Sequence, residues 1–378
     1  MSHTNKKKIA FFAPSMRGGG AERVMLDLAT GFSKLNFSVD LVLVKAEGPY
    51  LAFAPDTINI IDLGATRTLK SLPALVRYLR QVRPLAILST IDHINQIVVW
   101  ARILARVPVR VVVREADTIP YLQIGSKKRL MSFVHKQVKA KTYLLADKIV
   151  AVSTGVSENL QTFLQIPKTS IEVIYNPVDD KMIVQCAQES IDHMWFTDST
   201  TPVILAVGRL AIQKDFLTLI HAFSFVRKRI KSKLLILGEG PERSNLEAAI
   251  IELGLENEVG LPGFCSNPFP YIAKAKALVL SSIHEGLPNV LIQSLVLGTP
   301  VVSTDCKSGP SEILDDGRYG RLVKVGNIED LSKAIIESIE SDIDDEYRRS
   351  LIERGRFYSV DTAIAAYKRV LAPDFERE

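Results

Sequence analysis

Short apolar runs, rich in Val and Ile, recur along the first half of the chain and alternate with segments of helical periodicity. A run that is apolar at every position predicts a strand buried on both faces, as in a parallel sheet covered by helices. We therefore expect strands at residues 9–14, 39–44, 58–63, 85–90, 109–115 and 148–153.

The same pattern starts again after about residue 180. Five further strands are expected, at residues 203–209, 234–240, 277–282, 301–305 and 321–325. Strands that alternate with helices predict the α/β class, here two doubly wound parallel sheets in tandem. A chain of 378 residues also has room for two hydrophobic cores. The polar, proline-flanked stretch 176–202 separates them, so we expect an N-terminal domain over residues 1–180 and a C-terminal domain over 181–355.

Composition is that of an ordinary globular protein, with 47% hydrophobic and 24% charged residues. The three cysteines, Cys186, Cys265 and Cys306, form no CxxC pair and have no histidine at metal-ligand spacing, which indicates a reducing compartment and no zinc site. The apolar run from Ile9 to Ala13 is too short for a signal peptide, and no stretch approaches the length of a membrane span. A cytoplasmic protein is expected, with peripheral attachment to the inner face of a membrane left open.

Charge is divided unevenly along the chain. Residues 1–190 hold 25 Lys and Arg against 15 Asp and Glu, whereas the remaining residues hold 22 against 27. Such an asymmetry concerns partners rather than fold, because a basic surface attracts phosphates, anionic lipid or nucleic acid.

Two stretches of the first half combine basic and apolar residues. One is a basic amphipathic helix over residues 127–141, which begins with Lys127, Lys128 and Arg129. The other is the stretch 67–83, where five basic residues surround leucines: Arg67, Lys70, Arg77, Arg80 and Arg83 around Leu72, Leu75 and Leu79. Both predict contact with an anionic membrane surface, and a solvated helix face is the alternative. Nucleic acid is not expected as a partner, since no aromatic platform accompanies the charge.

The first expected strand is followed by three glycines, Gly18, Gly19 and Gly20, and then by a helical pattern. Glycines let the backbone approach an anion closely, and a helix N-terminus adds unpaired N–H groups. An anion site and a purely structural turn are both open. The spacing is not that of the dinucleotide fingerprint.

Two loops of the second half predict a phosphate site. Arg209 follows Gly208 at a strand end, and Lys214 lies five residues further on, so the two cations can approach a diphosphate from two sides. Gly238, Gly240 and Pro241 follow the next strand, where Arg243 replaces the third glycine of a dinucleotide site. A tight turn that lines a nucleotide pocket is therefore expected rather than a NAD site.

Two more loops carry carboxylates beside glycine and proline. In the segment 281–293, Pro288 opens a helix, and Glu285 precedes it as a candidate acceptor of hydrogen bonds from sugar hydroxyls. Capping of that helix is the alternative for Glu285. In the segment 305–313, Gly309 and Pro310 begin a helix, and Ser311 and Glu312 add polar groups suited to a sugar. Four polar, glycine-containing loops at successive strand ends together predict a binding site.

Taken in order, the segments GGGAERV, GRLAIQKD, LGEGP, SIHEGLPNVLIQSL and SGPSEIL closely resemble glycosyltransferase family 4, from about residue 8 to residue 371. The resemblance implies a GT-B fold, in which two Rossmann-like domains face each other across a cleft. It also implies retaining transfer from a nucleotide diphosphate sugar, without metal or cofactor. The final segment 356–378 resembles the family's C-terminal helix, which returns to the first domain.

The resemblance assigns roles to particular residues. Arg209 and Lys214 match the diphosphate-binding pair, and Glu285 matches the first carboxylate of a Glu-x7-Glu motif that contacts the donor sugar. Gln293 stands at the second carboxylate, a departure from the family, although an amide still accepts one hydrogen bond and donates another. The other residues expected at the donor are Gly18, Gly19, Gly20, Gly208, Gly238, Gly240, Pro241, Cys265, Gly286, Leu287, Asn289, Val290, Gly309, Pro310, Ser311 and Glu312.

The N-terminal domain is expected to present the acceptor. Glu115, at the end of the fifth strand, is the best match to a family residue near the reaction, and Arg114 is its rival. His93, which follows the fourth strand, is an acceptor-side candidate, with an ordinary loop residue as the alternative.

A retaining glycosyltransferase is thus expected, which moves a hexose or N-acetylhexosamine to a glycan or lipid-linked glycan in surface polysaccharide assembly. The SGPSEIL segment favours a UDP-sugar, and GDP-mannose stays open. A sugar-nucleotide epimerase or hydrolase of the same fold is the rival enzyme class. A binding module without catalysis is a third alternative, which Gln293 alone favours.

Overall fold

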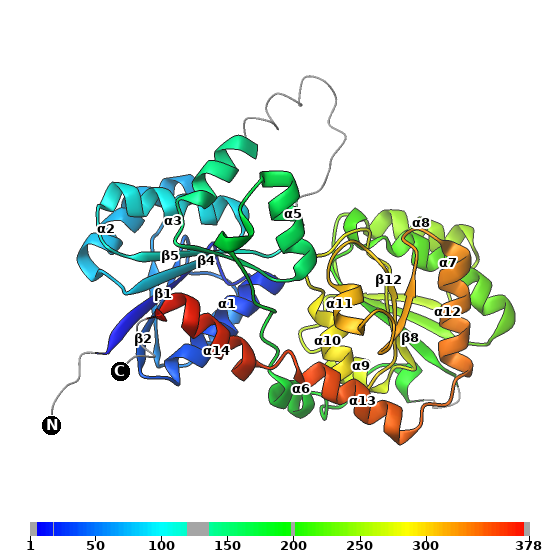
Figure 1. Ribbon diagram of the computed structural model, residues 1–378. Coiled ribbons are helices and arrows are strands. Elements are labelled where there is room, and N and C mark those ends of the chain that lie inside the picture. Colours follow the sequence, from blue (N-terminus) through cyan, green and yellow to red (C-terminus); the bar gives the residue numbers. More distant parts are fainter. Residues whose placement is uncertain (1–5, 18, 119–135, 198–200, 374–378) are drawn as a thin grey trace. The chain divides into compact units, whose positions relative to one another are not determined.

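The computed structural model describes residues 6–17, 19–118, 136–197 and 201–373. The chain divides into two compact units, shown in Figure 1. Unit 1 comprises Met1–Pro177 and Val360–Glu378, and unit 2 comprises Val178–Ser359. The boundaries between the units therefore fall after residues 177 and 359, whereas boundaries after residues 180 and 355 were expected from the sequence.

The sheet of unit 1 has seven parallel strands in the order β3-β2-β1-β4-β5-β6-β7. The chain crosses from β3 on one side of β1 to β4 on its other side, so the sheet is doubly wound. Its strands are β1 (Lys7–Ala13), β2 (Phe37–Leu43), β3 (Ile58–Asp62), β4 (Ala86–Thr90), β5 (Arg110–Glu115), β6 (Lys148–Ala151) and β7 (Ile171–Val173).

Helices cover both faces of this sheet. Phe11 and Phe12 point to opposite faces of β1 and are both fully buried, which explains the continuous apolar run in the sequence. Helices α1 (Gly20–Ser33) and α14 (Val360–Leu371) lie together on one face, and α2 (Leu72–Val82) and α3 (Asp92–Ala105) lie on the other (Figure 1). Helix α5 (Thr154–Leu164) and the short 3-10 helices η1 (Pro49–Phe53), η2 (Thr68–Ser71) and η3 (Lys168–Ser170) also belong to this unit.

Helix α14 returns from unit 2 and packs closely on α1. A Cβ atom on Gly31 would lie 2.4 Å from Cδ1 of Ile364, so the glycine allows the two helices to approach. The Nε of Arg110, on β5, donates to the carbonyl of Val370 at 2.6 Å. Helix α14 is therefore part of the core of unit 1.

The sheet of unit 2 has six parallel strands in the order β10-β9-β8-β11-β12-β13. These are β8 (Val203–Val207), β9 (Lys233–Leu237), β10 (Val259–Gly263), β11 (Ala277–Leu280), β12 (Val301–Thr304) and β13 (Arg321–Val323). Helices α7 (Phe216–Arg229), α8 (Arg243–Glu252) and α12 (Ile328–Glu340) bury one face against Ile204 and Ala206 of β8. Helices α9 (Phe269–Lys274), α10 (Asn289–Val296) and α11 (Pro310–Leu314) lie on the other face (Figure 1). The unit also contains α6 (Asp180–Cys186) and α13 (Asp345–Arg356).

The predicted α/β class and the two parallel sheets are confirmed, but two strands were missed. Strand β7 has three residues and only one buried position, so it gives no apolar run. Strand β10 contains two glycines and a proline at the edge of its sheet, where an N–H group is not needed for pairing. Both are edge strands, which bury less side-chain surface.

None of the helices within the described ranges is long and apolar enough to span a bilayer. The predicted basic helix at 127–141 falls largely outside the described residues, including Lys127, Lys128 and Arg129. Of its later residues, Lys139 is 4% exposed and therefore does not belong to a solvated basic face. Leu75 and Leu79 of the second basic stretch are also fully buried, so they pack on the sheet and are not available to a membrane.

Candidate functional site

Four of the loops predicted to bind the donor follow the carboxyl ends of strands in unit 2. Gly208–Lys214 follows β8, Gly238–Pro241 follows β9, and Ser281–Pro288 follows β11. The loop 305–309 follows β12. Because the strands are parallel, these four loops meet at one edge of the sheet, where ligands of open α/β folds bind.

Hydrogen bonds join these loops to one another. The N–H of Gly208 donates to the carbonyl of Leu237 at 3.0 Å, which ties the loop after β8 to the end of β9. Gln213 uses both backbone and side chain: its carbonyl accepts from Ile283 at 2.8 Å, and its Nε2 donates to the carbonyl of His284 at 2.9 Å. The position of Lys214 is therefore fixed relative to the loop that carries Glu285.

Lys214 and Glu285 form an ion pair at the centre of this edge. Their Nζ and Oε1 atoms are 2.5 Å apart, and the side chains are 18% and 9% exposed. The hydroxyl of Ser282 donates to the same Oε1 atom at 2.6 Å. Ser282 itself is held by β12, since Thr304 Oγ1 donates to its carbonyl at 2.6 Å. A cation and a carboxylate thus stand together in fixed positions, where one suits a phosphate and the other a sugar hydroxyl.

Two further side chains lie on these loops. Arg209 is exposed on the loop that also carries Lys214. Cys306 is buried, and burial together with the negative charge of Glu285 raises the pKa of its thiol to about 12. The thiol therefore stays protonated at neutral pH and is not a nucleophile.

Gly309 allows the loop after β12 to approach the loop after β11. Its φ is +93°, and a Cβ atom there would lie 2.5 Å from Cδ of Pro288. Ser308 adds a hydrogen bond to the carbonyl of Gly286 at 2.7 Å. The two loops that begin α10 and α11 are therefore packed backbone to backbone.

We expect Gly309→Ala to lower the free energy of unfolding of unit 2 by more than Gly326→Ala does. Gly326 also has a positive φ, of +72°, but its Cβ would meet nothing within 4 Å. The control therefore shows only the cost of the left-handed conformation, about 1–2 kcal/mol, whereas Gly309→Ala must also displace a loop. Urea denaturation of both variants checks this, and equal losses would contradict the close packing at Gly309.

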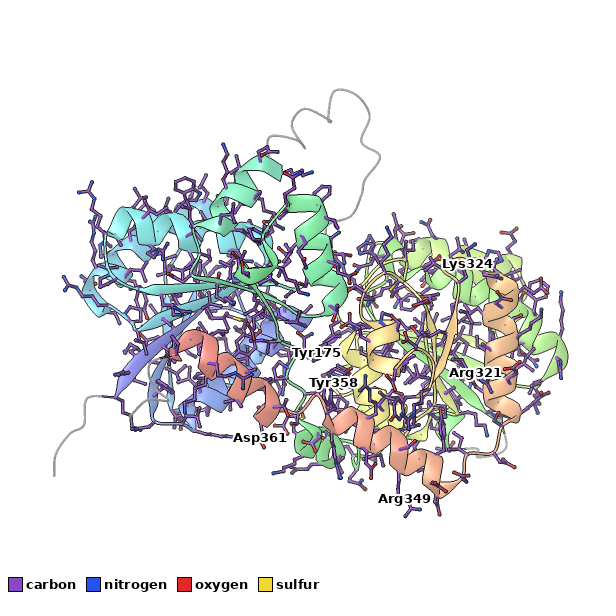
Figure 2. The ribbon with its side chains drawn as sticks, viewed as in Figure 1. Tyr175, Arg321, Lys324, Arg349, Tyr358 and Asp361 are labelled. Carbon is purple, nitrogen blue, oxygen red and sulfur yellow. The ribbon has the colours of Figure 1, made fainter. Side chains whose placement is uncertain are left out.

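The remaining donor-side candidates lie on the same edge. Gln293 is half-buried in α10, and Glu312 is half-buried in α11. The carbonyl of Glu312 accepts from the hydroxyl of Tyr358, labelled in Figure 2, at 3.2 Å. Cys265 donates through Sγ to the carbonyl of Asn267 at 3.2 Å, and burial raises the pKa of its thiol. Their contacts with a donor stay predictions.

In unit 1, Glu115 lies in a buried polar network. Its Oε2 is 2.8 Å from Nζ of Lys139 and also accepts from the hydroxyl of Tyr143 at 2.8 Å. Lys139 is in turn 3.3 Å from Oδ1 of Asp92, and Asn95 donates to the oxygen of Tyr143 at 2.9 Å. Burial raises the pKa of Glu115, and the attraction of Lys139 opposes that rise. Glu115 therefore joins β5 to α3 and to the helical residues 136–144.

Arg114 is buried on the other face of β5, with 1% of its surface exposed. Its Nη1 donates to Thr90 Oγ1 at 2.8 Å, and its Nη2 donates to Asn176 Oδ1. Burial lowers the pKa of the guanidinium, and the nearby Tyr367 of α14 opposes this. The side chain of Arg114 connects β4, α14 and the segment before unit 2, and its contact with an acceptor stays a prediction.

The glycine-rich loop of unit 1 ends in a capped helix. The N–H of Gly19 donates to Glu22 Oε2 at 2.9 Å, and Ser15 Oγ donates to Glu22 Oε1 at 2.9 Å. The carboxylate of Glu22 thus takes the N–H group that an anion would use at Gly19, which favours the structural turn there. Gly20 is exposed, and Gly18 lies outside the described residues. His93 is exposed on the first turn of α3, and its acceptor role stays a prediction.

Two family models match the chain. "Glycosyltransferase Family 4" matches residues 18–181, and "Glycosyl transferases group 1" matches residues 188–357. A relative from Campylobacter jejuni, N-acetylgalactosamine-N,N'-diacetylbacillosaminyl-diphospho-undecaprenol 4-alpha-N-acetylgalactosaminyltransferase, is 34% identical over 346 residues, which cover 89% of this chain and 91% of the relative. The chain belongs to glycosyltransferase family 4.

Other known proteins are similar over nearly the full length. The lipopolysaccharide 1,6-galactosyltransferase of Escherichia coli K12 is 26% identical over 365 residues, or 93% of this chain and 94% of that one. HepE of Anabaena, solved in complex with UDP, superposes with a TM-score of 0.78 at 18% identity and covers 97% of this chain and 100% of its own. WaaG, from lipopolysaccharide biosynthesis, has a TM-score of 0.73 at 15% identity and covers 96% and 99%. The fold of this glycosyltransferase is therefore GT-B.

The sequence of this glycosyltransferase does not show which side chains pair with its charged site residues, namely Ser282 with Glu285, and Lys139 and Tyr143 with Glu115. Ser282 precedes Glu285 by three residues, and its place just after a strand marks it as a hydroxyl of the same loop. The contacts of Lys139 and Tyr143 with Glu115 could not be found in this way, because a helical pattern of basic residues does not show which side chain turns inward. Among the residues that the structure describes, no group of three or more His, Cys, Asp or Glu side chains could hold a metal ion.

Proposed function

We propose that this family 4 glycosyltransferase moves a hexose or N-acetylhexosamine from a UDP-sugar to a glycan acceptor, with retention of configuration and without a metal ion or cofactor. The acceptor is proposed to be a lipid-linked glycan in the assembly of a surface polysaccharide or oligosaccharide. The observation that carries the proposal is the Lys214–Glu285–Ser282 arrangement, which lies where donors bind in α/β folds.

The relatives support the choice of substrates. The Campylobacter relative is named for an acceptor on diphospho-undecaprenol and for transfer of N-acetylgalactosamine. The Escherichia coli relative is named for transfer of galactose to lipopolysaccharide. HepE has been solved with UDP and glucose. The names of the two relatives support a glycan acceptor, and the HepE complexes support a UDP-sugar donor, although the fold comparisons alone would support only the architecture.

The proposed mechanism assigns one task to each charged group. Lys214 and Arg209 stabilise the negative charge that develops on the leaving diphosphate as the glycosidic bond breaks. Glu285 accepts hydrogen bonds from the donor sugar, and Ser282 and Lys214 hold its carboxylate in place. Gln293, at the second carboxylate position of the motif, binds a ribose hydroxyl through its amide. The acceptor hydroxyl attacks the face of the sugar from which the diphosphate leaves, and the leaving phosphate takes its proton.

Binding of UDP is expected to raise the melting temperature more than GDP or ADP at equal concentration, because a ligand that binds only the folded state stabilises it. Transfer from a UDP-sugar is expected to need an acceptor and to proceed equally well in EDTA. The checks are thermal shift and product analysis with and without acceptor. Donor turnover that needs no acceptor would indicate an epimerase or hydrolase, and loss of transfer in EDTA would contradict the metal-independent mechanism.

The proposed acceptor is lipid-linked, and unit 1 presents a surface suited to an anionic membrane. Arg67 precedes η2, Lys70 lies on η2 and Arg77 lies on α2, and all three are exposed. Helix α3 contacts η2 and α2, and its exposed apolar side chains follow a helical spacing: Trp100, Ile103 and Leu104, at 42%, 40% and 50% exposure. A surface that combines basic side chains with an exposed tryptophan suits a bilayer interface.

Charge reversal by Arg77→Glu is expected to weaken binding to vesicles of phosphatidylglycerol and phosphatidylcholine about fivefold or more, since each basic residue at an anionic surface contributes about 1 kcal/mol. Lys231→Glu, an exposed position of unit 2, serves as the control. Vesicle sedimentation measures both. Equal binding by wild type and Arg77→Glu would contradict this surface.

A further inference from the structure

The loop after β2 is clamped to the glycine-rich loop after β1. The N–H of Met16 donates to the carbonyl of Glu47 at 2.8 Å, and the N–H of Tyr50 donates to the carbonyl of Met16 at 3.1 Å. Gly48 has a φ of +116°, and a Cβ atom there would lie 2.2 Å from the carbonyl of Met16. Only glycine permits this approach. The 3-10 helix η1, which follows, is therefore held at the carboxyl edge of the sheet of unit 1.

Two aromatic rings of η1 differ in their surroundings. Tyr50 and the adjacent Leu51 pack against the hydrophobic core of unit 1. Phe53 is 62% exposed, and its ring centre lies 6.2 Å from that of Tyr50, with the two rings at 69° to each other. Tyr50 and Leu51 anchor η1 to the core, so the exposed ring of Phe53 is not needed to hold η1 in place.

Arg23 of α1 stands beside both rings. Its guanidinium carbon lies 5.8 Å from the ring centre of Tyr50 and 5.9 Å from that of Phe53. Asp27, one turn further along α1, accepts from Nε of Arg23 at 2.9 Å and so fixes its direction. A guanidinium carries five N–H donors. An exposed ring thus adjoins an oriented group of hydrogen-bond donors.

We propose that Phe53 and Arg23 form a sugar-binding subsite that holds one pyranose ring of the acceptor glycan, an inference that rests on the transferase activity proposed above. The C–H face of a pyranose packs on the exposed aromatic ring, and its hydroxyls accept from the guanidinium. The subsite lies next to residues 15–17, since Met16 is hydrogen-bonded to Tyr50, at the edge of unit 1 where ligands of a parallel sheet bind. An aliphatic side chain in place of Phe53 would offer apolar surface but no flat face.

The subsite is tested on the full chain by saturation-transfer NMR with four methyl α-glycosides, those of glucose, galactose, N-acetylglucosamine and N-acetylgalactosamine. We expect saturation to reach the ring protons of at least one glycoside. Phe53→Ala and Phe53→Leu should each reduce it at least threefold, and Phe53→Trp should retain it. Ile60→Ala, on β3 of the same unit, is the matched control, since this apolar side chain is 39% exposed. An unchanged melting temperature shows that each variant is folded.

Two results would overturn the subsite. One is the absence of saturation for all four glycosides in the wild type, and the other is saturation in Phe53→Ala equal to that in the wild type. The proposed function is judged separately, by the UDP thermal shift and by acceptor-dependent transfer. If UDP binding and transfer both fail while Phe53→Ala still reduces saturation, the transferase proposal is wrong and the sugar contact stands. If transfer is found and substitution of Phe53 has no effect on saturation, the transferase proposal stands and the sugar-binding subsite is wrong.

Discussion

Lys214→Ala is expected to lower the rate of sugar transfer roughly 10²–10³-fold, the loss typical of removing one group that stabilises developing negative charge. The same change should destabilise unit 2. Glu285 is 9% exposed and would lose the cation that neutralises its charge. Loss of one partner by a buried polar group costs about 1–3 kcal/mol. Arg209→Ala should also reduce transfer strongly but leave stability unchanged, because Arg209 is exposed.

A double variant separates the two effects of Lys214. Lys214→Ala/Glu285→Ala removes both charges of this ion pair, so neither is left buried without the other. Stability should therefore recover while the rate of transfer stays low. Unfolding is followed by fluorescence in a Trp100→Phe background, which leaves Trp195 in unit 2 as the only tryptophan. Lys231→Ala is the control for loss of an exposed cation. Transfer at the wild-type rate by Lys214→Ala would contradict its role, and equal stability of single and double variants would contradict the ion pair.

Much of this fold could be predicted because buried parallel strands leave a direct signal. Strands such as β1 and β8 are apolar at nearly every position, since helices cover both faces of their sheets. Strands β7 and β10 lacked this signal because β7 has only one buried position and β10 contains two glycines and a proline. The order of glycine-containing loops after the strands then located the candidate donor site, because parallel strands bring their carboxyl ends to one edge.

The pairing of side chains could not be predicted in the same way. Lys214 and Glu285 are 71 residues apart, and their contact depends on how Gln213 holds the two loops together. Lys139 was placed on a basic surface by its neighbours in the sequence, although the structure turns it inward. Whether a polar side chain on a helix faces solvent or a buried carboxylate depends on what packs against that helix, and the sequence of the helix does not contain this information.

Lys139→Met is expected to lower the free energy of unfolding of unit 1 by about 3–5 kcal/mol at neutral pH, the usual loss when one partner of a buried ion pair is removed. Without the cation, Glu115 would stay buried near Asp92, and both carboxylates are negative. Burial already raises the pKa of Glu115, and Lys139 opposes this, so its removal should raise that pKa further. A raised carboxyl pKa means that the folded state binds the proton more tightly than the unfolded state. The deficit relative to wild type should therefore shrink as the pH falls from 7 towards 5.

Chemical denaturation at pH 5, 6 and 7 measures this deficit, with a Trp195→Phe background that leaves Trp100 of unit 1 as the only tryptophan. Glu115→Gln/Lys139→Met should regain most of the stability at pH 7, because the amide of glutamine still accepts from Tyr143 and carries no charge. Lys141→Met is the matched control, an exposed lysine of the same helix. A deficit that is the same at all three pH values would show that the loss comes from packing of the lysine chain and not from the charge of Glu115.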